Sequence, residues 1–269
     1  MKVLIINESA SITDLKNMII NLMKDKLGAE NAVINGSLAR YLHMIDTQEN
    51  DIKIPVDIDI DWKDINVTEE SLTKELNRIF KGYNESYVIE KTEIKLHDNK
   101  KLKSIRYSIN DMSNKDEIQY ITHIDIFLKK QDFVILTLEG TDINVIPTTN
   151  QIVSKMIILS EKRLMSGRRK DLTELYIYSF YKTIKASNII SFIKKNNYHV
   201  NSSKNFLNNK NKLKELFDLD VKLGNIKLQK GVTFQNIFNR VYNFLKPIID
   251  RDFNNNTAKY WDASSGTWK

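Results

Sequence analysis

The sequence contains no cysteine, only three prolines and only eight glycines among its 269 residues. The lack of cysteine excludes disulfide bonds, thiolate-based zinc sites and a thiol nucleophile, and it agrees with a reducing compartment. No run approaches the roughly 18–20 uncharged apolar residues of a membrane span. The opening MKVLIINESAS lacks the apolar core and cleavage site of a signal peptide. We therefore expect a cytoplasmic protein that does not enter a membrane.

Charge is unevenly distributed along the chain. Residues 1–147 hold 19 basic and 25 acidic side chains, a net charge of −6, whereas residues 148–269 hold 22 and 9, a net charge of +13. The whole chain has a net charge of +7 at pH 7, and 41% of its residues are hydrophobic. This apolar content suffices for a buried core. The basic half favours an anionic partner.

The hydrophobic pattern predicts two regions that meet at Pro147. Before it, helical spacing predicts helices over 12–27 and 68–80. The strands that we expect before Pro147 lie at 32–34, 52–62, 86–96, 101–109, 118–128, 132–138 and 142–146. The helices that we expect after it lie at 148–165, 170–185, 187–196, 203–217 and 232–248. The fold class is therefore α/β (α+β), with a mixed-sheet domain at 1–147 and a helical domain at 148–269. In the polar tail from Asn254, we expect loose order and exposed Trp261 and Trp268.

The first candidate site lies in VINGSLARYL (33–42), where a short apolar strand is followed by a helix. Gly36 allows a tight turn and close approach of a ligand. The Ser37 hydroxyl and the N–H groups of the helix N-terminus suit a phosphate. Arg40 lies on the same helix, where its side chain either contacts a phosphate or only covers one face of the helix. The alternative for Gly36 and Ser37 is a plain turn with a helix cap.

The second candidate site lies in KIPVDIDIDW (53–62), where aspartates alternate with apolar residues. On a strand, Asp57, Asp59 and Asp61 share one face and repel one another. Either that face is solvated, or a divalent cation binds it, because Mg²⁺ accepts carboxylate oxygens together with substrate phosphates. Two such ions ~3.5–4 Å apart can hold the attacking and leaving oxygens of a phosphoryl transfer. Asp125, in the strand ITHIDIFL, is the candidate third carboxylate, with a structural carboxylate as its alternative.

A Gly-Ser turn, an Asp-x-Asp strand and a later aspartate together resemble the nucleotidyltransferase superfamily related to polymerase beta. The segment INVIPTTNQIVSKMIILSEKRLMSGRRKDLTELY (143–176) is similar to the abortive-infection toxins of the AbiEii type. In these toxins a helix with a lysine precedes a basic turn and a Lys-Asp pair. The resemblance covers about residues 30–180.

The resemblance implies a metal site of Asp57, Asp59 and Asp125 that binds Mg²⁺ or Mn²⁺. It also implies that Gly36 and Ser37 hold the triphosphate. Three further residues would contact the nucleotide: Lys155, Arg168 and Asp171. The lead-in Lys53-x-Pro55-x-Asp57-x-Asp59 parallels the family spacing, so Asp61 is expected behind the ligands or in solvent.

The implied activity is transfer of a nucleoside monophosphate from a nucleoside triphosphate to a hydroxyl, with release of pyrophosphate. The resemblance further implies a bacterial toxin or phage-defence role, tRNA as the acceptor and an antitoxin protein as a partner. Two alternatives stay open. One is transfer to a small molecule such as an aminoglycoside, and the other is a non-catalytic protein of this fold that binds nucleic acid or a protein partner.

The sequence departs from the family pattern at three places. A loop is inserted at 46–53, and His123 stands where the toxins tend to have lysine. The spacing from Arg168 to Asp171 is one residue shorter than in the family, which leaves Arg169 as a competitor for the same role. Lys155 also has a structural alternative, since a lysine on an apolar helix can extend its ammonium to the rim.

Overall fold

A computed structural model describes most of the chain. The described residues are 11–45, 55–99, 101–114, 117–162, 169–181, 184–198, 209–226, 228, 231–250 and 259–269. They form two compact units, one up to Pro147 and one from Thr148 onward. The α/β fold class is confirmed. Within the described part of the chain, no helix is both long enough and apolar enough to cross a membrane.

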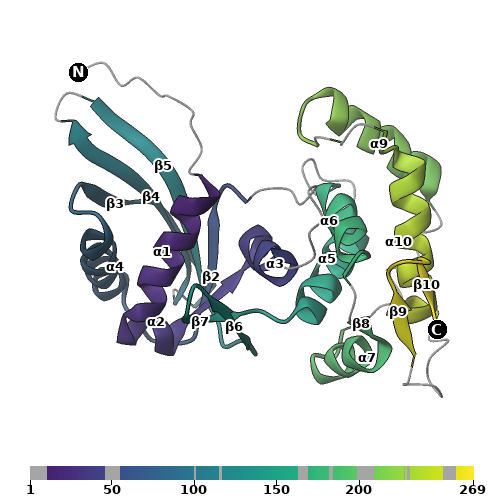
Figure 1. Ribbon diagram of the computed structural model, residues 1–269, viewed down its shortest axis with the longest axis horizontal. Coiled ribbons are helices and arrows are strands. Elements are labelled where there is room, and N and C mark those ends of the chain that lie inside the picture. Colours follow the sequence, from purple (N-terminus) through teal and green to yellow (C-terminus); the bar gives the residue numbers. More distant parts are fainter. Residues whose placement is uncertain are drawn as a thin grey trace. The chain divides into compact units, whose positions relative to one another are not determined.

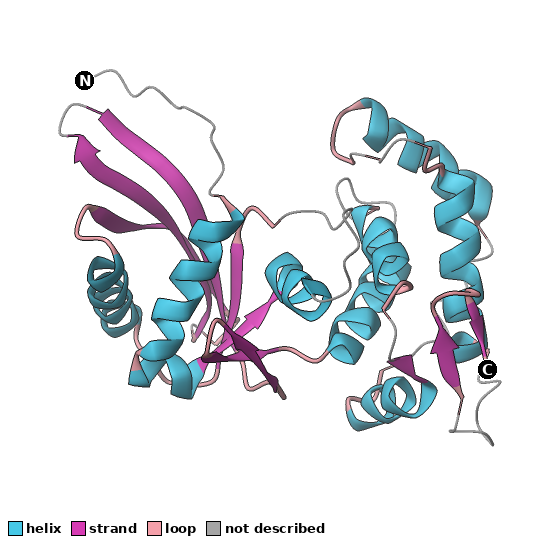
Figure 2. Cartoon of the chain, in the orientation of Figure 1, coloured by secondary structure: helices cyan, strands magenta, loops and turns pink. Residues whose placement is uncertain are grey.

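The first unit is built on one seven-stranded mixed sheet (Figures 1 and 2). Its strands are β1 (Ala32–Asn35), β2 (Ile58–Trp62), β3 (Tyr87–Leu96), β4 (Leu102–Asn114), β5 (Glu117–Leu128), β6 (Val134–Leu138) and β7 (Thr141–Val145). Their order is β3-β4-β5-β2-β1-β7-β6. The β2–β5 and β1–β7 pairs are parallel and the other pairs are antiparallel. Strand β2 therefore lies at the centre, between β1 and β5.

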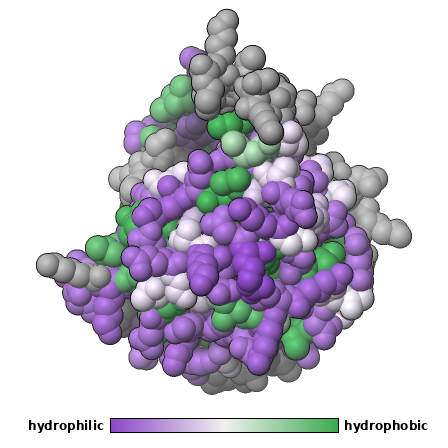
Figure 3. Space-filling view, turned by 90° about the vertical axis from the view of Figure 1, so that its left-hand side faces the viewer, coloured by the Kyte–Doolittle hydropathy of each residue, from purple (hydrophilic) through white to green (hydrophobic). Residues whose placement is uncertain are grey.

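The described residues of this unit also form the helices α1 (Ile12–Lys24), α2 (Lys26–Asn31), α3 (Gly36–Met44) and α4 (Glu69–Tyr83). Their apolar faces and those of the strands form one core, to which β2 contributes Ile58, Ile60 and Trp62. The alternate β2 positions, which carry aspartates, lie on the other face of the sheet. The face shown in Figure 3 is mostly hydrophilic, and its apolar residues form small separate groups, as expected when the apolar side of each element is buried.

The second unit is largely helical. It contains α5 (Thr148–Lys162), α6 (Lys170–Tyr178), α7 (Ala186–Lys195), α9 (Lys210–Lys222) and α10 (Phe234–Ile249). A three-stranded sheet of β8 (Ile184–Lys185), β9 (Tyr260–Asp262) and β10 (Thr267–Trp268) has the order β10-β9-β8. These elements share a second hydrophobic core, separate from that of the first unit.

The sequence predicted most elements but misjudged some bounds. The helix expected at 12–27 is two helices, because the side chain of Asp25 accepts a hydrogen bond from the Leu27 amide and starts α2. The helix expected at 170–185 ends at Tyr178, and the one expected at 203–217 is described from Lys210 to Lys222. Of the strand expected at 52–62, the described strand covers Ile58–Trp62.

The prediction of two exposed tryptophans in the tail was wrong. Trp261 is fully buried, and its indole N–H donates to the Ser179 carbonyl. Trp268 stacks on Phe244 with ring centroids 5.8 Å apart, and its indole N–H donates to the Phe244 carbonyl. Burying these rings in the second core outweighs the polar character of the residues around them.

Candidate active site

The turn between β1 and α3 places the backbone against Asp59. Gly36 has φ +62°, a left-handed conformation that favours glycine, and its N–H donates to the side-chain oxygen of Asn35 over 2.7 Å. A Cβ at Gly36 would lie 1.8 Å from Oδ2 of Asp59. Only glycine therefore fits here, and its absent side chain is what allows the turn to touch the carboxylate.

Sheet register aligns the other acidic residues with this turn. Asp59 on β2 is paired with Asn35 on β1 and with Asp125 on β5. Paired residues of neighbouring strands point to the same face of a sheet, so the side chains of Asp59 and Asp125 share one face. Asp57 lies two residues before Asp59, and the Ser37 hydroxyl donates to its Oδ1 over 3.2 Å.

The structure thus brings together five of the residues predicted from the sequence. They are Gly36, Ser37, Asp57, Asp59 and Asp125, and they come from the start of α3, the segment leading into β2, and the strands β2 and β5. Arg40, also predicted, lies on α3 and is fully buried.

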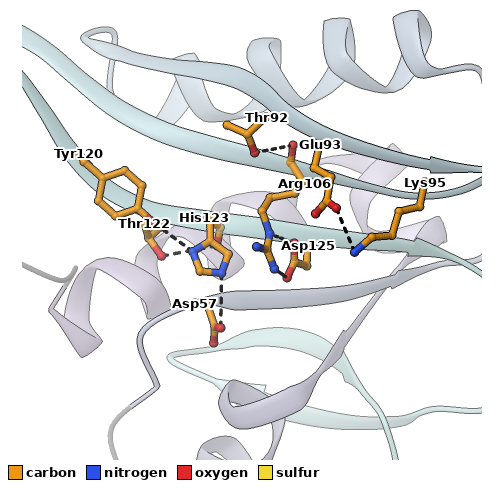
Figure 4. A network of polar contacts seen from close by, with 9 residues as sticks. All are labelled: Asp57, Thr92, Glu93, Lys95, Arg106, Tyr120, Thr122, His123 and Asp125. Carbon is orange, nitrogen blue, oxygen red and sulfur yellow. Dashed lines mark hydrogen bonds and ion pairs between the residues drawn. The ribbon is translucent and has the colours of Figure 1, made fainter. Parts of the chain in front are cut away.

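His123 and Tyr120 on β5 extend the site beyond Asp57 (Figure 4). His123 Nε2 lies 3.5 Å from Asp57 Oδ2, and His123 Nδ1 shares a hydrogen bond of 2.9 Å with the Tyr120 hydroxyl. The hydrogen bond to Asp57 raises the pKa of His123, and burial opposes this shift. The sequence marked His123 only as a departure from the family pattern. His123 lies two residues before Asp125 on an expected strand, and this spacing alone predicts that both side chains point to the same face.

Arg106 on β4 was missed by the sequence interpretation, although it binds Asp125 directly (Figure 4). Its Nε donates to Asp125 Oδ1 over 2.6 Å and its terminal nitrogen donates to Oδ2 over 2.7 Å. This bidentate ion pair raises the pKa of Arg106. The two residues are register partners on neighbouring antiparallel strands. Both carboxylate oxygens of Asp125 are thus engaged by a cation that belongs to the chain itself.

Asp61 differs from the other two aspartates of its strand. It is fully buried rather than solvated. Its carboxylate accepts hydrogen bonds from the side-chain nitrogen of Asn35 and forms an ion pair with Lys129. Burial raises the pKa of Asp61, while the charge of Lys129 and the hydrogen bonds oppose this shift. The structure therefore assigns Asp61 to a buried polar cluster farther along β2, on the same sheet face as Asp59.

The donors at the site suit a hard cation. Mg²⁺ in phosphoryl-transfer sites is bound through one or two carboxylates together with substrate phosphates. Asp57 and Asp59, beside the Gly36 turn, provide that number of carboxylates. Among the residues that the structure describes, no group of three or more His, Asp or Glu side chains is arranged to hold a metal. Asp57 and Asp59 are the residues that could hold such a cation together with a bound phosphate.

The remaining predicted residues belong to the second unit. Lys155 on α5 has its Nζ 2.6 Å from Glu174 and 3.1 Å from Asp171 on α6. Burial alone would lower the pKa of Lys155, but the charges of Glu174 and Asp171 outweigh it and raise the pKa. The ammonium therefore does not extend to the rim as a lone charge but is ion-paired within the unit.

Of the two arginines considered before α6, Arg168 lies outside the described residues. Arg169 is buried, and its Nε forms an ion pair of 2.7 Å with Asp220 and a hydrogen bond of 3.1 Å to the Leu216 carbonyl. These contacts join α6 to α9 within the second unit. They give Arg169 a structural role and weaken its case as a substitute for Arg168.

No protein-family model matches the chain, and no curated protein matches it. Crystal structures with a similar fold include two from Helicobacter pylori. A proposed nucleotidyltransferase from H. pylori is 18% identical with a TM-score of 0.53, and the match covers 91% of this chain and 96% of that one. The protein JHP933 from Helicobacter pylori is 16% identical with a TM-score of 0.53, and the match covers 92% and 94%. At these identities the likeness establishes the fold.

Proposed function

We propose that the chain is a nucleotidyltransferase that transfers a nucleoside monophosphate from a nucleoside triphosphate to a hydroxyl. The observation that carries this proposal is the contact of the Gly36 backbone with Asp59, joined by the hydrogen bond of Ser37 to Asp57. This arrangement places a helix N-terminus, which favours phosphate, beside two carboxylates that favour a divalent cation. The fold shared with a proposed nucleotidyltransferase supports it.

Each residue of the site would have a distinct task. The first turn of α3 and the Ser37 hydroxyl would bind the triphosphate. Asp57 and Asp59 would hold Mg²⁺ or Mn²⁺, which when bound neutralises charge on the phosphates and on the departing pyrophosphate. The acceptor oxygen would form a bond to the α-phosphorus as the bond from that phosphorus to the bridging oxygen breaks. The hydroxyl proton would pass to a carboxylate.

Asp125 is the carboxylate proposed to take that proton and complete the site. Arg106 donates hydrogen bonds to both of its oxygens. Each carboxylate oxygen keeps a second lone pair that can take the proton while Arg106 is bound. The negative charge of a bound triphosphate is a suitable alternative partner for the guanidinium.

Within this proposal the acceptor is an RNA such as tRNA, and the chain acts as a toxin with an antitoxin partner. The similarity of residues 143–176 to the AbiEii type supports this role, and so does the charge of +13 on residues 148–269. Binding of RNA through basic side chains weakens steeply with added salt. Transfer to an aminoglycoside instead of RNA would identify the alternative of a small-molecule enzyme.

The test is incubation of the full chain with each labelled nucleoside triphosphate, Mg²⁺ and total tRNA. Asp59→Asn removes a carboxylate from the site, whereas Asp98→Asn removes an exposed one in the turn between β3 and β4. We expect the wild type and Asp98→Asn to transfer alike, and Asp59→Asn to lose on the order of 100-fold or more. A folded wild type that neither transfers label nor binds nucleotide in calorimetry would contradict the proposal.

A further inference from the structure

A connected set of polar contacts lies behind the Gly36 turn. Lys129 Nζ lies 3.2 Å from Asp61 Oδ2, and the Asn35 side-chain nitrogen lies 3.2 and 3.1 Å from the two Asp61 oxygens. The Asn35 side-chain oxygen accepts from the Gly36 N–H over 2.7 Å. The contacts therefore run from Lys129 through Asp61 and Asn35 to the backbone that touches Asp59.

Asp61 fixes which way the Asn35 amide faces. An ionised carboxylate only accepts hydrogen bonds, so the amide nitrogen of Asn35 has to face it. The amide oxygen is then left facing the Gly36 N–H. If the Asn35 amide were reversed, its oxygen would face the Asp61 carboxylate. Its nitrogen would then face the Gly36 N–H, and neither pair could form a hydrogen bond. Lys129, whose side chain is 48% exposed, places its positive charge 3.2 Å from Oδ2 of the buried Asp61.

We propose that Asp61 is a positioning residue of the proposed transferase: through Asn35 it holds the Gly36 turn in the geometry that binds the triphosphate beside Asp59. The inference rests on the proposed function for its effect on substrate. It assigns to Asp61 a role other than the metal ligation that its place in the Asp-x-Asp-x-Asp series suggests.

Exchange of the two side chains tests this directly. Asn35→Asp alone places two carboxylates where the amide nitrogen met Asp61, and repulsion between them should displace the turn. Asp61→Asn alone keeps an oxygen for the Asn35 nitrogen but adds a donor beside it, so the orientation of the Asn35 amide is no longer fixed and a partial effect is expected. In the double variant, the amide of the new residue at 61 donates to the carboxylate at 35, which still accepts from Gly36. A hydrogen bond between positions 35 and 61 and the one from Gly36 are thereby restored with the same total charge, although the carboxylate beside Lys129 is lost.

The expected results form a double-mutant cycle with a strong coupling. Asn35→Asp should raise the KM for nucleoside triphosphate about tenfold or more, with a smaller change in kcat, because the turn binds the phosphates. Asp61→Asn alone should raise this KM by less than Asn35→Asp does, and the double variant should return to within about threefold of the wild type. A residue that only stabilises the fold would instead reduce the active fraction at constant KM. A metal ligand would lose transfer in Asp61→Asn and would not recover in the double variant.

A second measurement needs no nucleotide and separates this inference from the proposed function. Hydrogen exchange of residues 33–38 in the free protein should accelerate in Asn35→Asp and return to wild-type rates in the double variant. The matched control is Asn110→Asp, which places a carboxylate beside Glu90, the partner of the Asn110 amide on β3. It should leave both the KM and the exchange of residues 33–38 unchanged.

Three outcomes would overturn the inference. They are unchanged exchange in Asn35→Asp, failure of the double variant to recover, and loss of transfer in Asp61→Asn at wild-type stability. A wild type without transfer or nucleotide binding would overturn the proposed function alone, and the exchange cycle would still decide whether Asp61 positions the turn.

Discussion

Replacing Gly36 with alanine should disable the site at a moderate loss of stability. The new Cβ would lie 1.8 Å from Oδ2, 2.7 Å from Cγ and 3.0 Å from Cβ of Asp59. Because three atoms of Asp59 are too close, the whole side chain has to move, and rotation of the carboxylate alone is insufficient. The residue would also occupy φ +62°, which is unfavourable for any side chain.

Two other glycines separate these effects. Gly140 has φ +77°, and a Cβ added there would have no heavy atom within 4 Å, so Gly140→Ala carries only the backbone strain of about 1–2 kcal/mol. Gly82 lies in α4 with open space around its Cβ direction, so Gly82→Ala should stabilise the protein by about 0.5–1 kcal/mol. Gly36→Ala combines strain with crowding and should lower the free energy of unfolding by about 2–4 kcal/mol.

Urea unfolding gives the stabilities, and calorimetry with nucleoside triphosphate and Mg²⁺ gives the binding. We expect Gly36→Ala to lose nucleotide binding at temperatures where it is fully folded, and Gly140→Ala to bind as the wild type does. The reasoning would be refuted if Gly36→Ala bound nucleotide normally, or if it were no less stable than Gly140→Ala.

Three further predictions concern the two cores. Burial raises the pKa of Tyr107 to about 12, so the folded state keeps a proton that the unfolded state loses above pH 10. Stability should be full below pH 10 and fall by about 2–3 kcal/mol toward pH 12, and urea unfolding from pH 9 to 11 should show a smaller decline in Tyr107→Phe. Trp261→Ala should lower the unfolding free energy of the second unit by about 3–5 kcal/mol, whereas a change below 1 kcal/mol in thermal or urea unfolding would contradict its buried placement. Lys155→Met leaves the carboxylates of Asp171 and Glu174 without this cation and should cost about 3 kcal/mol at neutral pH, with partial recovery at acidic pH in the same assay.

Local sequence patterns predicted the strand and the turn on which the candidate site is built. Apolar and acidic residues alternate through β2, and that alternation predicted a strand with the isoleucines in the core and Asp59 at an alternate position. The strand, Gly-Ser and helix pattern predicted the turn at Gly36. These features depend on neighbours in sequence, so periodicity and turn chemistry suffice to find them.

Contacts between distant segments could not be predicted in this way. Arg106 meets Asp125 only because β4 and β5 pair in one register, and a shift by one residue would turn the arginine to the opposite face. Lys129 reaches Asp61 only because β5 lies beside β2. The tail was misjudged for the same reason, since Trp261 is buried against elements that precede it by many residues. The hydrophobicity pattern along the sequence does not reveal which distant segments pair or pack together.

The central position of β2 has a consequence for the newly made protein. Its partner β1 precedes it, but its parallel partner β5 (Glu117–Leu128) is synthesised only after α4, β3 and β4. Parallel pairing of distant segments closes slowly, because a long stretch of chain must be ordered first. A nascent chain that has not yet released β5 from the ribosome therefore has the Gly36 turn and Asp59 but lacks Asp125. The complete constellation forms only after translation of the first unit is almost finished.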